Sequence, residues 1–438
     1  MSFLGVCQLA LLALCVQGVV IVAQTPRPEQ CSGKANTLPV WTGEPRLINK
    51  TTNGSLYVVG DGEDQFHVLH VYGTAYQMGY AHGQLLGPQA NAVVTGYLAY
   101  AEAQIGEYIK FLPKKMAEWI ERVGLEAALD ATAVMTRPYT PEYFFEEMHG
   151  LADATGIEYK TVLQMHMLPE LIKASCSMMG AWGGALTDAT GLLQLRALDF
   201  GTDSILQDYP VVTVYHPSVN GHAFASVGWA GFLTGIAGMS SAGMGISEKV
   251  SDIPFGTESR SGIPFNLLMR DVLQFDTNID QATKRIMTAH RTCSIWLGVG
   301  AGAGAERDFR IFQYSASTAK VYTDKNITLV NETRFNREHC DDVCYNQYTM
   351  TDVLYWGVHL GCWNEVLREN HGRITPELII NMGGRVKTGD LLSVVYDLHG
   401  LNMYVSNAKG SKETGDLNAY DRRFVKLDAA KLFAQARR

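Results

Sequence analysis

The spacing of hydrophobic and polar positions changes near residue 175. Before that point, apolar residues recur at helical spacing from about residue 90 to residue 122, which predicts a helix broken near Leu112-Pro113. Thr140-Pro141-Glu142 is a typical helix start, with an N-cap residue, a proline at the first position and an acid in the first turn. That helix is expected to end near Gly156, and another is predicted over residues 159–174 despite its proline.

The segment that precedes these helices has a different pattern. Residues 24–64 are rich in Pro, Gly, Thr and Asn and are expected to be mostly loop. Residues 66–72 alternate as a strand does. The glycine-punctuated residues 73–83 then lead into a helix, so the first third of the chain is predicted to be mainly helical.

Beyond residue 175, short apolar runs alternate with glycine-rich turns, a pattern typical of consecutive strands. A strand, turn and strand are predicted around Ser175-Cys176-Ser177, with the turn at residues 187–191 and the second strand ending in Arg196 to Asp199. The remaining predictions are strands at residues 211–215, 223–227, 231–238, 243–247, 295–299, 309–314 and 319–322 and a helix at 271–290. No repeat or linker separates an independent domain.

The first 23 residues form an apolar segment that ends in Ala23. Gln17 and Gly18 interrupt it, which favours a cleaved secretory signal peptide over the alternative, an uncleaved anchor helix. No Lys or Arg precedes Arg27, so the usual positive n-region is missing. We therefore expect a secreted or lysosomal protein, and no later stretch is apolar enough to suggest a stable membrane span.

Charge and sequons extend this picture. The formal net charge is -8 and no basic run occurs, so a nucleic-acid partner is not expected. Four Asn-x-Ser/Thr sequons suit the secretory route, and Asn49, Asn53 and Asn326 are the candidate glycosylation sites among them. The fourth, at Asn331, has a competing interpretation that is given below.

Six cysteines remain after the signal segment. Four are disulfide candidates, Cys31, Cys340, Cys344 and Cys362. Cys340 and Cys344 are close enough for a small-loop disulfide in an oxidising compartment. Metal binding beside His339 is the alternative, but no second Cys/His pair has a suitable spacing, so no metal is predicted. If Cys176 is a working thiol, the odd remainder implies a second unpaired cysteine.

A cysteine nucleophile must be a thiolate or have a base beside it. His290 or His359 would supply that base in a papain-like arrangement, but the residues around Cys176 do not match the signature of that family. The alternative is a buried structural cysteine.

Several motifs together resemble the cysteine N-terminal-nucleophile (Ntn) hydrolases of the penicillin acyltransferase type, relatives of acid ceramidase and of N-acylethanolamine-hydrolysing acid amidase. In chain order the motifs are Gly73-x-x-Tyr76-x-x-Gly79-x-x-His82-Gly83, Cys176-Ser177, Arg196-x-x-Asp199, the turn at residues 235–243, and Gly262-x-Pro264 running to Arg270. The resemblance covers roughly residues 65 to 400.

The resemblance implies an α+β fold, a four-layer αββα sandwich of mainly antiparallel sheets with a helical N-terminal segment. It also implies that the chain cuts itself between Ser175 and Cys176, leaving a helical subunit of residues 24–175 and a strand-rich subunit of 176–438 within one combined domain. The freed α-amino group would then be the base. Its pKa of about 7.7–8.0, lowered further by burial, suits general-base work.

By the same resemblance, Arg196 and Asp199 would orient the new amine and contact substrate, and Glu248 would support the site through Arg196. Asn331 falls where the family has an asparagine that holds the oxyanion. A buried oxyanion donor is incompatible with a glycan, so Asn326 would be the glycosylated neighbour. The chain departs from the family pattern at Ala197, Ser177-Met178 and Ser240, which affects the substrate class more than the mechanism.

The function implied is an amidase that cleaves linear amide bonds of a small molecule or lipid, such as a ceramide or an N-acylethanolamine, through an acyl-thioester on Cys176. Its partners would be that substrate and its own cleaved subunit, and no cofactor is needed. Apolar candidates for an acyl pocket are Met178, Met179, Trp182, Trp229, Phe232 and Met239. The alternatives are an acyltransferase that uses the same acyl-enzyme, a bile-salt or penicillin hydrolase, and an inactive secreted binding protein that keeps the fold.

Overall fold

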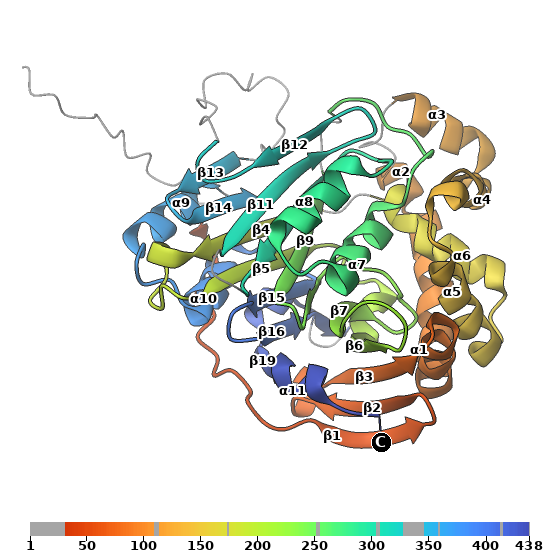
Figure 1. Ribbon diagram of the computed structural model, residues 1–438, viewed down its shortest axis with the longest axis horizontal. Coiled ribbons are helices and arrows are strands. Elements are labelled where there is room, and N and C mark those ends of the chain that lie inside the picture. Colours follow the sequence, from red (N-terminus) through yellow and green to blue (C-terminus); the bar gives the residue numbers. More distant parts are fainter. Residues whose placement is uncertain are drawn as a thin grey trace, which may run out of the picture.

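Two β-sheets packed face to face form the centre of the molecule (Figure 1). The structure, a computed structural model, describes residues 31–108, 114–172, 175–250, 255–303, 307–326, 346–357, 360–411 and 415–437. The predicted signal segment, Asn331, Cys340 and Cys344 lie outside these residues.

The larger sheet has ten strands and draws on both halves of the chain. Its strands in spatial order are β1 (Arg46–Thr51), β2 (Gly54–Val59), β3 (Phe66–Gly73), β6 (Pro210–Pro217), β7 (Phe224–Trp229), β8 (Gly238–Ser240), β9 (Met244–Val250), β10 (Ile295–Ala301), β11 (Asp308–Tyr314) and β12 (Ala319–Tyr322). The pairing of β3 with β6 is parallel. The other described neighbours in this sheet are antiparallel.

The second sheet has seven strands. In spatial order they are β13 (Asn346–Met350), β14 (Val353–Gly357), β4 (Ser175–Trp182), β5 (Leu192–Asp199), β15 (Leu392–Asp397), β16 (Asn402–Asn407) and β19 (Val425–Asp428). Its described pairings are antiparallel. A separate two-stranded ribbon joins β17 (Lys409–Ser411) to β18 (Gly415–Leu417).

Helices cover the outer faces of both sheets. β4 and β5 of the smaller sheet contact β9 and β10 of the larger one. Helices α7 (Phe265–Phe275) and α8 (Ile279–Thr288) pack on the larger sheet, while α9 (Leu360–Glu369) and α10 (Pro376–Val386) pack on the smaller. The layer order is therefore helix, sheet, sheet, helix, which confirms the predicted α+β, mainly antiparallel αββα sandwich.

Most of the remaining helices gather at one side of the sandwich (Figure 1). They are α1 (Ala75–Ala103), α2 (Ile105–Tyr108), α3 (Lys114–Val123), α4 (Leu125–Thr136), α5 (Glu142–Thr155) and α6 (Tyr159–Met167), and a short α11 (Ala429–Ala434) lies near the C-terminus. The start of α1 is fixed by a capping box between Thr74 and Gln77. Helix α1 contacts both α5 and β3, so it joins this helical group to the larger sheet.

The expectation of loop over residues 24–64 is wrong for part of that stretch. β1 and β2 form there and extend the ten-stranded sheet beside β3. β1 is almost wholly exposed and only Gly54, Leu56 and Val59 of β2 are buried, so the two strands are specified by their pairing rather than by a buried apolar run. The N-terminal segment is therefore partly strand as well as helical.

Three other element predictions need correction. The single helix expected over residues 271–290 is two helices, since the chain becomes extended at Asp276. The helix expected to reach residue 174 ends at Met167 and continues as one 3-10 turn containing Pro169, whose ring disfavours an α-helical interior. Residues 231–237, expected to be a strand, are irregular.

Local signals predicted other elements correctly. The strand–turn–strand around Cys176 is the β4–β5 pair. Helix α5 ends before Gly156, which takes the left-handed conformation (φ 73°) that glycine favours at a helix end. Its start differs by one residue, because Pro141 rather than Thr140 occupies the N-cap position.

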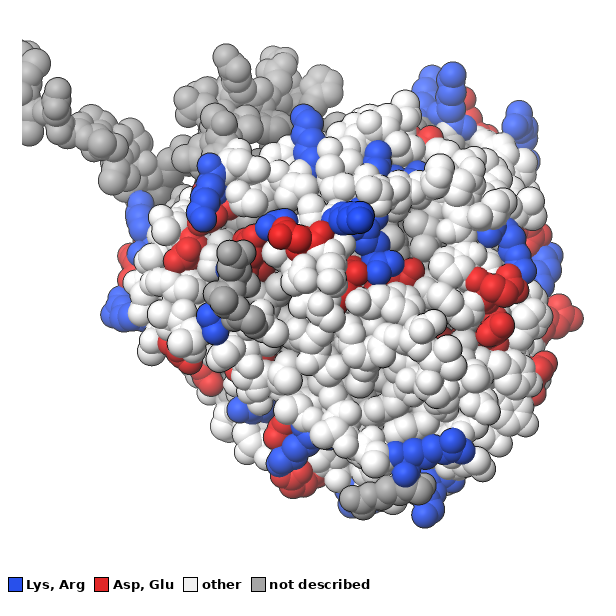
Figure 2. Space-filling model, viewed as in Figure 1, with Lys and Arg blue, Asp and Glu red and all other residues white. Residues whose placement is uncertain are grey.

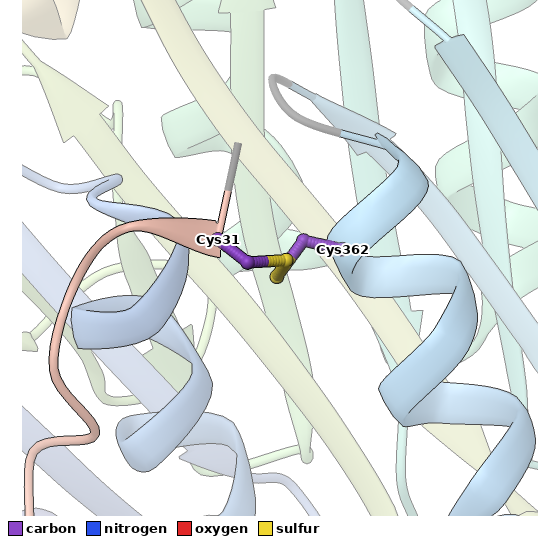
Figure 3. The surroundings of a disulfide bond; sticks show 2 residues. All are labelled: Cys31 and Cys362. Atoms are coloured by element: carbon purple, nitrogen blue, oxygen red, sulfur yellow. A yellow bond between two sulfur atoms is a disulfide. The ribbon is translucent and has the colours of Figure 1, made fainter. Parts of the chain in front are cut away.

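Cys31 and Cys362 form a disulfide across 331 residues of sequence, joining the N-terminal segment to α9 (Figure 3). Both were disulfide candidates, and their pairing ties the two ends of the fold together. Charged side chains of both signs are interspersed over the face in Figure 2. Within the described residues, no helix has the length and apolar character needed to cross a membrane.

Candidate active site

The register of the β4–β5 hairpin decides which side chains meet. Ser175 lies opposite Asp199, Cys176 opposite Leu198, and Met178 opposite Arg196. Alternate residues of a strand point to opposite faces, so Cys176 and Arg196 share one face of the sheet and Asp199 points to the other. The shared face looks toward the ten-stranded sheet, because Met178 accepts a hydrogen bond from Ser247 of β9 (3.6 Å).

The Cys176 side chain is completely buried between the sheets. Burial raises the pKa of the Cys176 thiol to about 12, and the carboxylates of Glu248 and Asp199 act in the same direction, whereas Arg196 and Lys249 oppose them. In the intact chain the thiol is therefore protonated at neutral and acidic pH. It needs a base before it can act as a nucleophile.

Arg196 is fixed on three sides and fully buried. Its guanidinium donates to the carbonyl oxygens of Ala197 (2.8 Å) and Ile236 (3.2 Å) and forms a salt bridge with Glu248. Burial raises the pKa of Glu248, while Arg196 pulls that pKa down. The structure thus brings together Cys176, Arg196 and Glu248, three of the five residues that the sequence proposed for the catalytic site.

Asp199 lies at the same end of the hairpin but its carboxylate is held by a different loop. Thr388 Oγ1 donates to it (3.0 Å), as do the backbone N–H groups of Gly389 and Asp390. Burial raises the pKa of Asp199 to about 6, and the hydrogen bonds from residues 388–390 oppose that rise. Thr388 also contacts Ser177 (2.8 Å), which links Asp199 to the residue that follows the thiol.

The Thr388-Gly389-Asp390 loop was missed by the sequence reasoning. It follows α10, about 190 residues after Asp199, and no pattern in the sequence connects the two. A threonine before a glycine signals only a turn.

An apolar pocket adjoins the hairpin. Leu198, the strand partner of Cys176, lines it, and Glu248 is the charged member of the lining. The full lining comprises Tyr97, Pro169, Ile172, Leu198, Phe200, Leu206, Trp229, Phe232, Ile236, Glu248, Val250 and Phe265. Both predicted subunits contribute to it.

Of the six candidates for an acyl pocket, two line this apolar pocket. Trp229 and Phe232 line the pocket. Met178, Met179, Trp182 and Met239 are buried elsewhere in the core. Sequence alone does not separate them, because Met and aromatic side chains also fill ordinary core positions.

The three candidate glycosylation residues lie on segments other than the hairpin. Asn49 and Asn326 are exposed, and Asn53 is half-buried. Cys176 and Cys293 are both buried thiols. The described residues contain no group of three or more His, Cys, Asp or Glu side chains arranged to hold a metal ion.

Comparison with known proteins identifies close relatives. The chain is 38% identical over 444 residues to protein dcd1A of Dictyostelium discoideum, covering 97% of this chain and 99% of that protein. It is 38% identical over 422 residues to protein dcd1B of the same organism, covering 91% of this chain and 81% of that protein. An uncharacterized protein of Archaeoglobus fulgidus is 25% identical over 293 residues, 62% of this chain and 47% of that protein. No protein-family model matches the chain.

Three solved structures overlap parts of the chain at 12–13% identity. A Caenorhabditis elegans N-acylethanolamine-hydrolyzing acid amidase ortholog has a TM-score of 0.37 over 51% of this chain and 93% of that chain. A mutant of conjugated bile acid hydrolase from Clostridium perfringens has a TM-score of 0.34 over 57% and 96%, respectively. Penicillin V acylase from Agrobacterium tumefaciens has a TM-score of 0.33 over 57% and 94%.

The Arg196–Glu248 pair gives the first testable prediction. Replacing Glu248 by Leu leaves a buried guanidinium without its counter-charge, and we expect the free energy of unfolding to fall by about 3–5 kcal/mol. Adding Arg196→Met removes the unpaired buried charge and is expected to recover much of the lost unfolding free energy. Urea unfolding of the two single variants and the double variant, all carrying Cys176→Ala to keep one intact chain, measures the coupling. If the losses in unfolding free energy of the two single variants simply add in the double variant, Arg196 and Glu248 are not a coupled ion pair.

Proposed function

This chain belongs to the dcd1 protein family, and we propose that it is a self-processing amidase that cleaves linear carbon–nitrogen amide bonds through an acyl-thioester on Cys176. The observation that carries the proposal is a buried thiol on the same face as a fixed arginine, beside an apolar pocket. A fatty acyl amide such as a ceramide or an N-acylethanolamine suits that pocket, since apolar side chains dominate its lining.

Self-processing would give the thiol a base for turnover on external substrates, and in the cut itself the thiol proton passes to the amide nitrogen that leaves. In the intact chain Cys176 Sγ attacks the carbonyl carbon of Ser175. The new C–S bond replaces the Ser175–Cys176 C–N bond, and the thiol proton ends on the released nitrogen. Water then hydrolyses the thioester, which leaves a carboxylate on Ser175 and a free α-amine on Cys176. That amine is a base of suitable pKa and belongs to the same residue as the thiol.

Turnover repeats the same chemistry on an external amide. The α-amine accepts the thiol proton while Sγ attacks the substrate carbonyl carbon. The proton passes to the leaving amine as the C–N bond breaks, and the acyl group remains on sulfur. Water, deprotonated by the same amine, then releases the fatty acid and restores the thiol.

Three charged residues near the hairpin have a role in this scheme. Asp199, opposite Ser175, accepts a hydrogen bond from the new amine and orients it. Arg196 favours the thiolate, because a buried positive charge beside sulfur lowers its pKa. Glu248 keeps Arg196 in place. Asn331 remains our candidate for the oxyanion donor.

We also propose that the protein follows the secretory route to the cell exterior or the lysosome, with residues 1–23 as its signal peptide. The Cys31–Cys362 disulfide favours an oxidising compartment. Asn49 and Asn326 are exposed and therefore accessible to glycosylation.

The cut itself is the most direct consequence. Protein recovered from a secretory expression host is expected to carry a second N-terminus at Cys176, because the thiol cleaves the bond before it. Intact mass and N-terminal sequencing detect it. Cys176→Ala is expected to stay uncut, while the matched buried-thiol variant Cys293→Ala is cut normally. If a wild-type chain in which Ser175 and Cys176 are still joined turns over amides, the mechanism is wrong.

The disulfide predicts how the two pieces behave after the cut. Cys31 lies before the cut and Cys362 after it, so the pieces remain covalently joined until the disulfide is reduced. We expect one band on a non-reducing gel and two on a reducing gel. Cys362→Ser is expected to give two bands under both conditions. Two wild-type bands without reductant would contradict the pairing.

The hydrogen bonds to Asp199 predict a pH effect. Thr388 stabilises the carboxylate form, so Thr388→Val is expected to raise the pKa of Asp199 from about 6. The acid limb of the kcat/KM profile then moves upward by about one pH unit. Thr388→Ser keeps the hydroxyl donor and is expected to match the wild type. If the acid limb does not move in Thr388→Val, or moves equally in Thr388→Val and Thr388→Ser, an ionised Asp199 does not take part in the mechanism.

A further inference from the structure

The irregular residues 230–237, here called the pocket loop, form part of the apolar pocket and touch the catalytic hairpin. Phe232 and Ile236 line the pocket, and the Ile236 carbonyl accepts a hydrogen bond from Arg196 (3.2 Å). A shift of this loop would change the pocket, whereas Arg196 is also held by the Ala197 carbonyl and by Glu248. What holds the loop therefore matters to the site.

Two buried histidines of the N-terminal segment hold its backbone. The Gly231 N–H donates to Nε2 of His82 on α1 (2.8 Å), and the Leu233 N–H donates to Nε2 of His166 on α6 (3.0 Å). Both side chains are at most 1% exposed. Because a loop lacks the regular pairing of a strand, these side-chain acceptors satisfy N–H groups that would otherwise be buried unpaired.

A third contact comes through an ion pair. Arg270 of α7 donates to the Leu233 carbonyl oxygen (2.6 Å) and is paired with Glu147 of α5. Arg270 and Glu147 are each 1% exposed. The loop is thus held by His82, His166 and, through Arg270, Glu147, all three from the segment before the predicted cut.

Both histidines must be neutral to accept these hydrogen bonds. His166 Nδ1 lies 2.7 Å from the Val162 carbonyl, so its proton is on Nδ1 and its Nε2 is an acceptor. Burial lowers the pKa of His82 to about 3, with nearby His166 and Arg270 adding to the effect, and lowers that of His166 to about 4. Both acceptors therefore persist in mildly acidic surroundings.

This contact also explains a motif that the proposed chemistry leaves unused, the glycine and histidine pattern of residues 73–83. A Cβ at Gly79 would lie 2.0 Å from the Glu147 carbonyl oxygen, so glycine lets α1 pack closely against α5. At the other end of the contact, Gly231 has φ +84°, a conformation that other residues rarely adopt. The motif therefore places His82 against the pocket loop.

We propose that His82 is a positioning residue that sets acyl-chain specificity, by holding the Gly231 N–H and with it the Phe232 wall of the pocket. The acyl group as ligand rests on the proposed amidase function. The N-terminal segment is then a permanent part of the pocket after the cut, since it supplies the acceptor that fixes the loop.

Two substitutions at one position test this. His82→Gln keeps an acceptor of similar reach, whereas His82→Met fills similar space without one and leaves the Gly231 N–H buried and unpaired. Binding is measured by titrating each protein with a fluorescent fatty acid. Turnover is measured with N-acyl aminomethylcoumarins from butanoyl to hexadecanoyl.

We expect His82→Met to weaken fatty-acid binding about tenfold and to raise KM for the long acyl chains by a similar factor. KM for butanoyl and the kcat values stay close to those of the wild type, because the hairpin itself is intact. His82→Gln is expected to restore the wild-type dependence on chain length.

The proposal is wrong if His82→Met binds the fatty acid as tightly as the wild type does. It is also wrong if KM rises equally for all acyl-chain lengths, or if His82→Gln does not restore the wild-type dependence on chain length. If His82→Met does not fold, His166→Met and His166→Gln give the same comparison at Leu233. If neither methionine variant folds while the glutamine variants do, the histidines are merely structural and the proposal fails. Absence of turnover in the wild type counts against the amidase function alone, since the fatty-acid titration decides the role of His82 independently.

Discussion

The antiparallel register between β4 and β5 is the constraint on which the site depends. It places Cys176 and Arg196 on the face between the two sheets and sets Ser175 opposite Asp199. A shift of one residue would turn every side chain of β4 to the other face. The buried Arg196–Glu248 pair fixes which face of β5 looks toward β9, because burial of the guanidinium is costly unless Glu248 stays opposite it.

The second constraint is that the two predicted subunits are not separate bodies. β1 to β3 belong to the same ten-stranded sheet as the strands after residue 176, and a disulfide joins Cys31 to Cys362. His82 and His166 complete the hydrogen bonding of a loop in the other piece. Breaking one peptide bond would leave nearly all of these contacts in place, which is what a protein that cuts itself and remains folded requires.

Local features of the chain were predictable from its sequence. The hairpin at Cys176 and the end of α5 at Gly156 follow from turn residues and periodicity that lie within a short window. Features set by contacts with distant residues were not predictable from the sequence. Residues 231–237 have apolar strand-like composition, but the N–H groups of Gly231 and Leu233 go to His82 and His166 rather than to a neighbouring strand. β1 and β2 were missed because pairing, not composition, defines them. The same holds for Thr388, whose tie to Asp199 has no local signature.

The central claim is that Cys176 carries the acyl group while its own α-nitrogen is the base. Mass spectrometry of protein quenched by acid during turnover of an N-acyl amide tests this most directly. We predict an acyl group linked as a thioester to a chain that begins at Cys176, and its loss on treatment with hydroxylamine. Turnover with the acyl group on another residue, or by a chain in which Ser175 and Cys176 are still joined, would contradict the account.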